Sequence, residues 1–335
     1  MNAAPLVSII TPCYNARPYL PATWHSIKRQ TFSDWEWIIW EDGSKDGSAE
    51  WLQALANTDS RIKVLRGERT KNAGAGRNKC MAIAAGKYWA FLDADDLWHP
   101  LKLEKQVSLL ESNPHVHITY SWMKEFWSIE ALEKNPPPKI WPRHELRYNA
   151  LSALLTKGNP ASPSTLFIRK NVAETIGGFK TDLAGLEDFE FVSRAVNLFK
   201  IKRTKGVLAA YRLHQQNMTH SMSNNFTGHE RLLNYLHQHK LLNKNGGNAF
   251  RSIYHTRRME FILEEKIAGN AKLEIIKALY WNGFTFKRWI PLLLIAVPKH
   301  QMLNIYVKLK RIQARILPTQ TKSHRFTSVQ SSKAK

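Results

Sequence analysis

A cluster of carboxylates follows one of the most apolar runs of the chain. Asp93, Asp95 and Asp96 come directly after residues 88–92, a run typical of a buried strand. Open α/β sheets bind their ligands at the carboxyl ends of the strands, and Mg²⁺-like ions favour carboxylates combined with substrate phosphate oxygens. The cluster therefore predicts a divalent-cation site beside a phosphate-bearing ligand. The alternative is a polar turn in which Asp95 or Asp96 caps the next helix.

A second pair of carboxylates, Glu187 and Asp188, follows Gly185 and precedes an apolar stretch with helical spacing. A carboxylate in such a place can take a proton from an attacking hydroxyl as a general base. Acidic residues at a helix N-terminus also complement the helix dipole, which by itself is the more common reason for such a pair. The pair Glu264 and Glu265 follows no glycine loop and lies within a helical run, so it is the weaker candidate.

Polar side chains also follow two earlier predicted strands. Residues 6–10 lead into Thr-Pro-Cys-Tyr-Asn at 11–15, and the apolar run 35–40 leads into Glu-Asp-Gly-Ser at 41–44. Carboxylates at this edge accept hydrogen bonds from the ribose in nucleotide-binding folds, so Asp42 is a candidate acceptor for a base N–H. The alternatives are a plain turn after the first strand and a helix N-cap after the second.

A glycine-rich loop, Asn-Ala-Gly-Ala-Gly-Arg-Asn at 72–78, opens a further stretch with helical spacing. Glycines permit close backbone approach, and helix N-termini stabilise anions. The loop therefore predicts a phosphate or ribose contact in which Arg77 takes part. It lacks the Gly-Lys-Ser/Thr ending of a Walker motif, and an ordinary glycine turn into a helix would look the same.

These candidate residues require a sheet that gathers the strand ends at one edge. In the first hundred residues, short apolar runs alternate with stretches of helical spacing, which predicts a doubly wound parallel α/β sheet. The expected strands are 6–11, 35–40, 62–65 and 88–92, and the expected helices are 19–30, 49–56 and 77–85. After Pro100 we expect helices at 101–110, 151–155 and 189–198, strands or extended segments at 116–121, 164–169 and 207–211, and a loop at 135–138.

The chain has 335 residues, a net charge of +22 and two cysteines, Cys13 and Cys80. This length allows one large or two modest domains. Two cysteines exclude a disulfide framework, and residues 1–5 lack the basic and apolar regions of a signal peptide, so we expect a cytosolic protein. The positive charge implies an anionic partner, such as nucleic acid, an acidic membrane surface or a polyanionic substrate.

Much of this charge lies in the C-terminal part, where no Asp or Glu occurs after Glu274. Residues 289–297 are apolar but contain Pro291, and they are too short to span a bilayer, which takes about 20 residues. Aliphatic residues at 305–316 are interleaved with lysines and arginines. This pattern favours a segment that lies in an anionic membrane interface. The alternative is an amphipathic helix packed on the rest of the chain, with a solvated basic face.

Together these motifs resemble the large inverting glycosyltransferase family 2. Its signatures occur over residues 5–220, at 7–15, 26–36, 41–48, 76–78, 91–98, 177–179, 186–191 and 211–214. Two features depart from the family pattern: Glu41 stands where the family usually has Asp, and the loop 72–78 is shorter than usual. The resemblance implies an α/β fold of the GT-A type, a doubly wound mixed sheet with a Rossmann-like nucleotide half at 1–100, an acceptor half at 101–225 and a C-terminal helical extension.

The resemblance also implies where the donor nucleotide binds. Pro12, Tyr14 and Asn15 line the uridine pocket, Asp42 accepts a hydrogen bond from the uracil ring, and Arg77 lies near the nucleotide. The extension 226–318 is expected to be helical, basic and membrane-associated, and the tail 319–335 disordered.

A metal and a base complete the site that the resemblance implies. Asp95 ligates the Mn²⁺ or Mg²⁺ that holds the diphosphate, Asp93 contacts the ribose or the outer shell of the metal, and His214 contacts the metal or the diphosphate. Asp188 is the general base for the acceptor hydroxyl, and Glu187 lies beside it.

The sequence thus predicts a metal-dependent inverting transferase that moves a sugar from a nucleotide-diphosphate donor, a UDP-sugar, to a hydroxyl group. The expected acceptor is a saccharide or lipid-linked saccharide in cell-surface polysaccharide or lipopolysaccharide synthesis, at the cytoplasmic face of the inner membrane. The alternative is a nucleic-acid-binding protein that uses the basic C-terminal region. No recognition helix, zinc spacing or RNA-binding signature occurs in the sequence, so we expect no nucleic-acid partner.

Overall fold

The computed structural model describes residues 4–129, 161–183 and 185–215, together with positions 140, 141, 146, 151, 154, 159, 217, 232 and 234–238. The chain divides into two compact units, 1–250 and 251–335, and all the described residues belong to the first. The predictions for the loop at 135–138, for most of the helix at 151–155, for nearly all of the extension and for the tail therefore lie outside the described residues.

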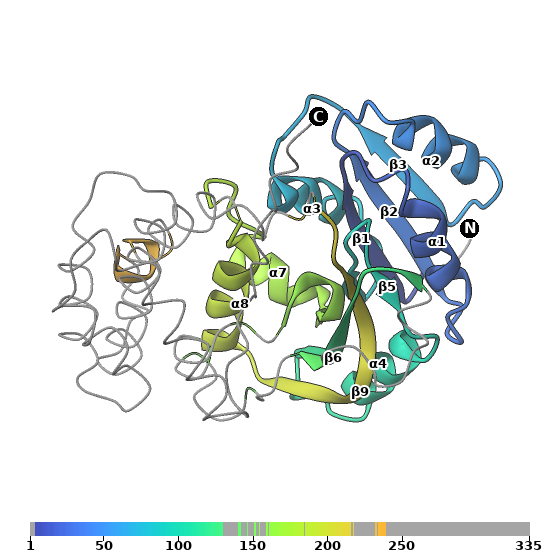
Figure 1. The fold of residues 1–335 in the computed structure, drawn as a ribbon. Helices are drawn as coiled ribbons and strands as arrows, with labels where there is room; N and C mark the ends of the chain where they lie inside the picture. The colour runs from blue at the N-terminus through green and yellow to red at the C-terminus, as the bar shows by residue number, and fades with distance from the viewer. Residues whose placement is uncertain are drawn as a thin grey trace, which may run out of the picture. The chain divides into compact units, whose positions relative to one another are not determined.

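The alternation of strands and helices predicted for the first hundred residues is confirmed (Figure 1). The elements are β1 (Val7–Cys13), α1 (Leu20–Lys28), β2 (Trp35–Glu41), α2 (Ser48–Ala56), β3 (Ile62–Arg66), α3 (Ala73–Met81) and β4 (Tyr88–Phe91). The start of α3 differs from the prediction by four residues. Asn72 caps this helix by accepting a hydrogen bond from the backbone N of Ala75 at 2.9 Å, so both glycines of the loop lie inside the helix.

The second half contributes the remaining described elements. They are β5 (Leu97–Trp98), α4 (Lys102–Glu111), β6 (Ile118–Phe126), β7 (Ile140–Trp141), a 3₁₀ turn (Pro163–Thr165), β8 (Phe167–Arg169), α7 (Lys170–Ile176), α8 (Glu187–Leu198) and β9 (Ile201–Arg212). The last strand begins six residues earlier than predicted. The first half of β9 is largely at the surface and carries Lys202, Arg203 and Lys205. Because these residues are charged, this part of the strand lacks the apolar run that would have predicted it.

All described strands belong to one mixed sheet with the order β3-β2-β1-β4-β8-β6-β9-β5, and β7 pairs with β6. The first four strands of this order are parallel, as predicted. Beyond them, β8 is antiparallel to both β4 and β6, whereas β6 and β9 run parallel. The carboxyl ends of β1, β2 and β4 therefore meet at one edge of the sheet, where the polar motifs follow them.

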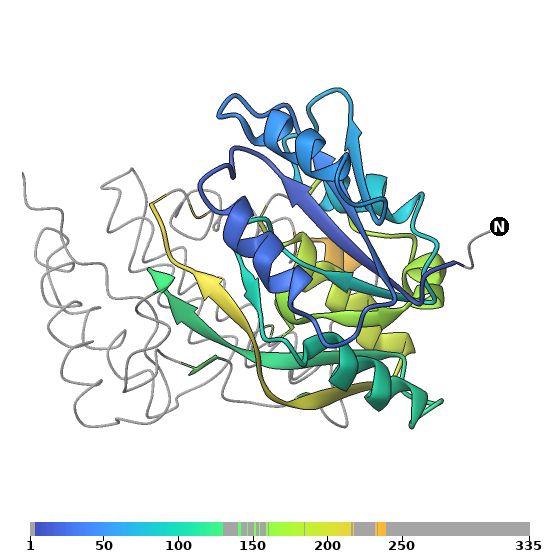
Figure 2. The ribbon, with the colours of Figure 1, turned by 90° about the vertical axis from the view of Figure 1, so that its right-hand side faces the viewer.

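Helices cover both faces of the sheet, and each face has its own hydrophobic core. Residues of α1, α2 and α4 pack with Val7, Ile9 and Trp37 on one face. Residues of α3, α7 and α8 pack with Ile10 and Phe91 on the other. In Figure 2 the blue α1 lies in front of the sheet and the yellow-green α8 behind it. Within the described part of the chain, every helix is too short or too polar to cross a lipid bilayer.

Candidate functional site

A pocket of about 640 Å³ lies at the carboxyl edge of the sheet, within the size range of small-molecule sites. Its lining includes every residue that the sequence analysis proposed for the site: Pro12, Tyr14, Asn15, Asp42, Arg77, Asp93, Asp95, Glu187, Asp188 and His214. Pro12 lies at the end of β1, and the others follow β1, β2, β4 and β9 or lie on α3 and α8. The fold thus gathers motifs from both halves of the described chain in one cavity.

One end of the pocket is built around Asp42. Its Oδ1 accepts hydrogen bonds from Trp40 Nε1 at 2.9 Å and from the backbone N of Thr70, and its Oδ2 accepts one from the backbone N of Lys71 at 2.9 Å. This carboxylate therefore holds the loop before α3. Lys71 adopts a φ of 55° there. Residues other than glycine rarely take this backbone conformation outside functional or constrained positions.

An aromatic and cationic pair lies at the same end of the pocket. Tyr14 is 40% exposed, and the guanidinium of Arg69 lies 3.9 Å from its ring centroid. The side-chain oxygen of Asn15, in contrast, already has a partner within the protein, since its Oδ1 accepts a hydrogen bond from the backbone N of Lys45 at 2.9 Å. The exposed ring of Tyr14 offers a flat surface on which a planar ligand can stack.

The three aspartates after β4 have three different environments. Asp96 is fully buried and accepts hydrogen bonds from Ser164 Oγ at 2.6 Å and from the backbone N of Arg212 at 3.0 Å, so it ties the loop to the second half of the described chain. Asp93 accepts a hydrogen bond from Arg77 Nη2 at 2.6 Å. Neither Asp95 nor Asp96 caps α4, whose N-cap is Leu101, so the helix-capping alternative is wrong.

Asp95 and His214 form the candidate metal site. Asp95 Oδ2 lies 2.9 Å from His214 Nε2, and the imidazole stacks on Tyr19 with ring centroids 4.6 Å apart. Two ligands at about 2.1 Å from one octahedral ion, at right angles, would lie about 3.0 Å apart. The spacing of these two atoms therefore fits a shared Mg²⁺ or Mn²⁺.

The protein supplies only part of such a coordination sphere. No group of three or more His, Cys, Asp or Glu side chains converges as a metal site among the residues that the structure describes. Asp93 is engaged by Arg77, which leaves Asp95 and His214 as the available pair. This arrangement fits an ion that takes its other ligands from water and substrate phosphates, as Mg²⁺ usually does.

Asp188 lies half-buried in the first turn of α8. Its Oδ1 accepts a hydrogen bond from the backbone N of Phe189 at 2.7 Å, and its Oδ2 accepts one from Asn159 Nδ2 at 3.3 Å. Burial first, and then the neighbouring carboxylate of Glu187, raise the pKa of Asp188 to about 7. A carboxylate with a pKa near neutrality can both accept and release a proton at physiological pH.

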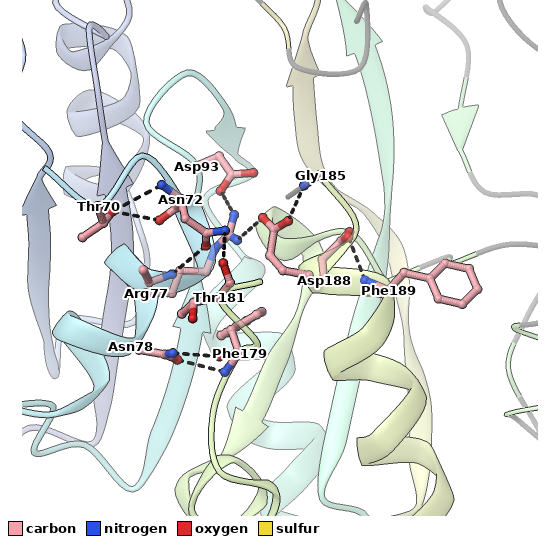
Figure 3. Close-up of polar contacts among 12 residues, drawn as sticks. Thr70, Asn72, Arg77, Asn78, Asp93, Phe179, Thr181, Gly185, Asp188 and Phe189 are labelled. Carbon is pink, nitrogen blue, oxygen red and sulfur yellow. Dashed lines mark hydrogen bonds and ion pairs between the residues drawn. The ribbon is translucent and has the colours of Figure 1, made fainter. Parts of the chain in front are cut away.

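The described contacts of the loop 72–78 join it to the segment before α8, and the anion contact predicted for it stays a prediction. The side chain of Asn78 makes two hydrogen bonds of 2.8 Å to the backbone of Phe179, and Asn72 Nδ2 donates to the carbonyl of Thr181 at 3.0 Å (Figure 3). A side chain at Gly74 would lie 3.1 Å from Glu187 Cγ. The motif therefore fastens α3 to the segment that leads into α8.

The same packing explains the Gly-Gly-Phe signature at 177–179. Gly178 has a φ of +73°, and a Cβ there would lie 2.7 Å from Asn78 Oδ1, so only glycine fits. The ring of Phe179 stacks on Phe191 of α8 with centroids 4.1 Å apart. Arg77, expected beside the nucleotide, is buried between Asp93 and Glu187, and its direct contact with a nucleotide stays a prediction.

Several pocket residues escaped the sequence analysis. Arg69 and Lys71 lie between β3 and α3, and Tyr19 precedes α1. Asn159 contacts Asp188 from a segment without a recognisable motif. The only signal for Arg69 and Lys71 was their position just before the glycine loop, and neither Tyr19 nor Asn159 had one.

Comparisons of the sequence with known proteins agree with these motifs. The model of the family described as Glycosyl transferase family 2 matches residues 8–177. An uncharacterized glycosyltransferase of Haemophilus influenzae is 32% identical over 230 residues, which are 67% of this chain and 70% of that protein.

Two further relatives match over a shorter stretch. The putative teichuronic acid biosynthesis glycosyltransferase TuaG of Bacillus subtilis is 47% identical over 109 residues, 32% of this chain and 43% of TuaG. The UDP-Glc:alpha-D-GlcNAc-diphosphoundecaprenol beta-1,3-glucosyltransferase WfgD of Escherichia coli is 42% identical over 108 residues, 32% of this chain and 42% of WfgD. The chain thus spans less than half the length of these two relatives.

Solved structures share the fold. S. aureus TarS 1–349 in complex with UDP-GlcNAc has a TM-score of 0.64 at 16% identity and covers 91% of both chains. The mannosyltransferase PcManGT from Pyrobaculum calidifontis, in complex with GDP-Man and Mn²⁺, has a TM-score of 0.53 at 16% identity, over 95% of this chain and 88% of its own. This likeness confirms the expected mixed α/β sheet of the GT-A type.

Proposed function

The chain belongs to glycosyl transferase family 2, and we propose that it is an inverting transferase for a nucleotide-diphosphate sugar, a UDP-sugar. The acceptor is a hydroxyl group of a saccharide or lipid-linked saccharide in bacterial cell-surface glycan synthesis. One observation carries this proposal: Asp95 and Asp188, which suit a metal ligand and a base, line the same pocket although they come from different halves of the chain.

The donor end of the pocket binds and orients the nucleotide. Tyr14 offers its exposed face to the base, and Oδ2 of Asp42, which accepts one hydrogen bond from the protein, has room to accept another from a base N–H. Asp95 and His214 would hold the divalent ion that the diphosphate of the donor requires. When bound, the ion supplies Lewis-acid stabilisation of the negative charge that develops on the leaving diphosphate.

The acceptor end supplies the base. Asp188 takes the proton of the attacking hydroxyl, a contribution typically worth about 10²–10⁴-fold in rate. Asn159 donates a hydrogen bond to one oxygen of Asp188, which orients the carboxylate. Because the base acts on the face of the sugar opposite the leaving group, an α-linked donor gives a β-linked product.

The names of relatives support the choice of donor and acceptor. WfgD is named as a UDP-glucose transferase that acts on a diphosphoundecaprenol-linked GlcNAc, and TuaG is named for teichuronic acid biosynthesis. The TarS structures contain UDP and UDP-GlcNAc, and that of PcManGT contains Mn²⁺. These names favour a UDP-sugar, a divalent cation and a lipid-linked acceptor for this chain as well.

A lipid-linked acceptor places the enzyme at a membrane. We propose that the basic C-terminal region, which has no Asp or Glu after Glu274, binds the anionic cytoplasmic face of the inner membrane without crossing it. Exposed basic residues contribute roughly 1 kcal/mol each near such a surface. The chain would then act as a peripheral protein beside its acceptor.

Ligand-dependent thermal unfolding tests the function class. We expect UDP with Mn²⁺ to raise the melting temperature more than UDP alone, because binding to the folded state stabilises it. Slow hydrolysis of a panel of sugar nucleotides then identifies the donor. Stabilisation by oligonucleotides, with no response to any sugar nucleotide, would favour the nucleic-acid alternative, which the family match does not support.

A further inference from the structure

Arg77 is one buried cation shared by two carboxylates from different halves of the chain. Only 3% of its side chain is exposed. Its Nη2 donates to Asp93 Oδ1 at 2.6 Å (Figure 3). Its Nη1 donates to Glu187 Oε1 at 3.2 Å. The guanidinium also lies 5.3 Å from the ring centroid of Phe179. An arginine suits this position, because its planar guanidinium can donate to two acceptors at fixed angles.

Each partner of Arg77 belongs to one side of the reaction. Asp93 lies two residues before the candidate metal ligand Asp95, on the donor side. Glu187 directly precedes the candidate base, and its second oxygen accepts a hydrogen bond from the backbone N of Gly185 at 3.0 Å. That hydrogen bond closes the turn that starts α8, where Gly185 has a φ of +84°.

We propose that Arg77 is a positioning residue that couples the two sides of the pocket, by holding Glu187 and the first turn of α8 against the loop that carries Asp93. This inference rests on the proposed function, in which Asp188 is the base. It replaces the nucleotide contact expected from the sequence with an indirect role. Arg77 acts on the base through Glu187 and acts on the donor side through Asp93.

The bridge also sets the charge around the base. Asp188 is faced by the carboxylates of Glu187 and Asp93, which raise its pKa, and by the guanidinium of Arg77, which lowers it. Asn159, which donates a hydrogen bond to Asp188, is neutral. Weakening the cation therefore shifts the titration of Asp188 upward, whereas neutralising Glu187 shifts it downward.

Two substitutions and one control separate this role from general packing. Arg77→Lys keeps a positive charge, but a single ammonium cannot reproduce the planar fork between both carboxylates. Glu187→Gln keeps the side-chain shape and removes one charge. Lys79→Met removes an exposed cation from the same helix without touching the bridge and serves as the control.

For each variant we would measure the UDP dissociation constant by calorimetry, kcat with a saccharide acceptor, and the Asp188 titration by carboxyl-carbon NMR, assigned with Asp188→Asn. Arg77→Lys should lower kcat by roughly 10- to 100-fold and raise the pKa of Asp188. The UDP dissociation constant should stay within about threefold of wild type. Glu187→Gln should also lower kcat but should move the pKa of Asp188 down, and Lys79→Met should change none of these quantities.

A tenfold weaker UDP affinity with unchanged kcat in Arg77→Lys would overturn the inference, since it would make Arg77 a nucleotide ligand. An unchanged Asp188 titration in both variants would also overturn it. If Arg77→Lys does not fold, the UDP affinity, kcat and Asp188 titration of Glu187→Gln test the inference in its place. Wild-type protein that binds no UDP and transfers no sugar would contradict the proposed function separately, because the NMR titration requires neither donor nor turnover.

Discussion

Asp95 Oδ2 and His214 Nε2 lie 2.9 Å apart, although 119 positions separate the two residues in the chain. The loop after β4 and the segment after β9 meet there because Asp96 accepts a hydrogen bond from the backbone N of Arg212, and Arg212 Nε donates to the carbonyl of Asp95 at 2.8 Å. The buried Asp96 thus fixes the position of its half-buried neighbour Asp95. The acidic cluster combines a structural carboxylate with a candidate metal ligand.

Removing Asp95 should abolish the metal dependence of UDP binding. Asp95→Ala deletes the oxygen ligand of the ion, so transfer should fall by roughly 10²-fold or more, and Mn²⁺ should no longer strengthen UDP binding in calorimetry. Asp34→Ala, at an exposed aspartate before β2, is the matched control and should behave as wild type. Near-wild-type turnover of Asp95→Ala would show that the cluster is structural.

The pH dependence of transfer should report Asp188. Its pKa of about 7 means that the base becomes ionised as the pH rises from about 6 to 8, so kcat/KM should rise through this window and fall about tenfold per pH unit below it. Initial rates in buffers of constant ionic strength measure this limb. A flat profile between pH 5.5 and 8 would contradict the assignment of Asp188 as the base.

The same shift has a defined sign for stability. The folded state binds the Asp188 proton more tightly than the unfolded chain, whose aspartates titrate at about 3.9. The stabilising contribution of this proton is therefore present at low pH and is lost as the pH rises through about 7. Asp188→Asn removes this dependence, so the difference in melting temperature between variant and wild type should grow from pH 5 to pH 8.

Asn159 should influence transfer through Asp188. Asn159→Asp keeps the oxygen that accepts the backbone N of Ala161 but replaces the donor to Asp188 with a carboxylate. A like charge beside Asp188 raises its pKa by about one unit or more, so the acid limb of kcat/KM should move to higher pH while UDP affinity is kept. Asn171→Asp, on the exposed side of α7, is the control. If the acid side of the kcat/KM profile does not move in Asn159→Asp, Asn159 does not influence the titration of Asp188.

Binding to anionic vesicles should weaken as salt rises. At 0.1 M ionic strength exposed charges are screened beyond about 10 Å, so full-length protein should pellet with acidic-lipid vesicles at low salt and less at high salt. Neutral vesicles are the control. Equal pelleting with neutral and acidic vesicles, at either salt concentration, would contradict an electrostatic role for the basic C-terminal region.

The fold of the first hundred residues was predictable because its patterns are local. The apolar runs of β1, β2 and β4 are bounded by turn residues, and the carboxyl ends of adjacent parallel strands share one edge. The presence of Asp42 and Asp95 in one pocket follows from these two facts. The start of α3 was missed because its first turn, Ala-Gly-Ala-Gly at 73–76, has no large apolar side chain, whereas the capping residue Asn72 defines it.

The contacts between the halves had no local signal. The pairing of Arg77 with Glu187 joins positions 110 residues apart, and the two hydrogen bonds of Asn78 to Phe179 span 101. The sequence alone shows the residue types but not their partners, so it indicated a phosphate or ribose contact for Arg77 but not the ion pairs of Arg77 with Asp93 and Glu187. Contacts of this kind, in which a buried polar group from one half of the described chain satisfies a group from the other, leave no mark in the local sequence pattern.

Whether Asp188 is the base of a sugar transfer is tested most directly by comparing Asp188→Asn with wild type in steady-state transfer from a UDP-sugar. The substitution is nearly isosteric and removes the proton acceptor. We expect kcat to fall by about 10²–10⁴-fold while the UDP dissociation constant stays within about threefold. Turnover of Asp188→Asn within a few-fold of wild type would contradict the assignment of Asp188 as the base.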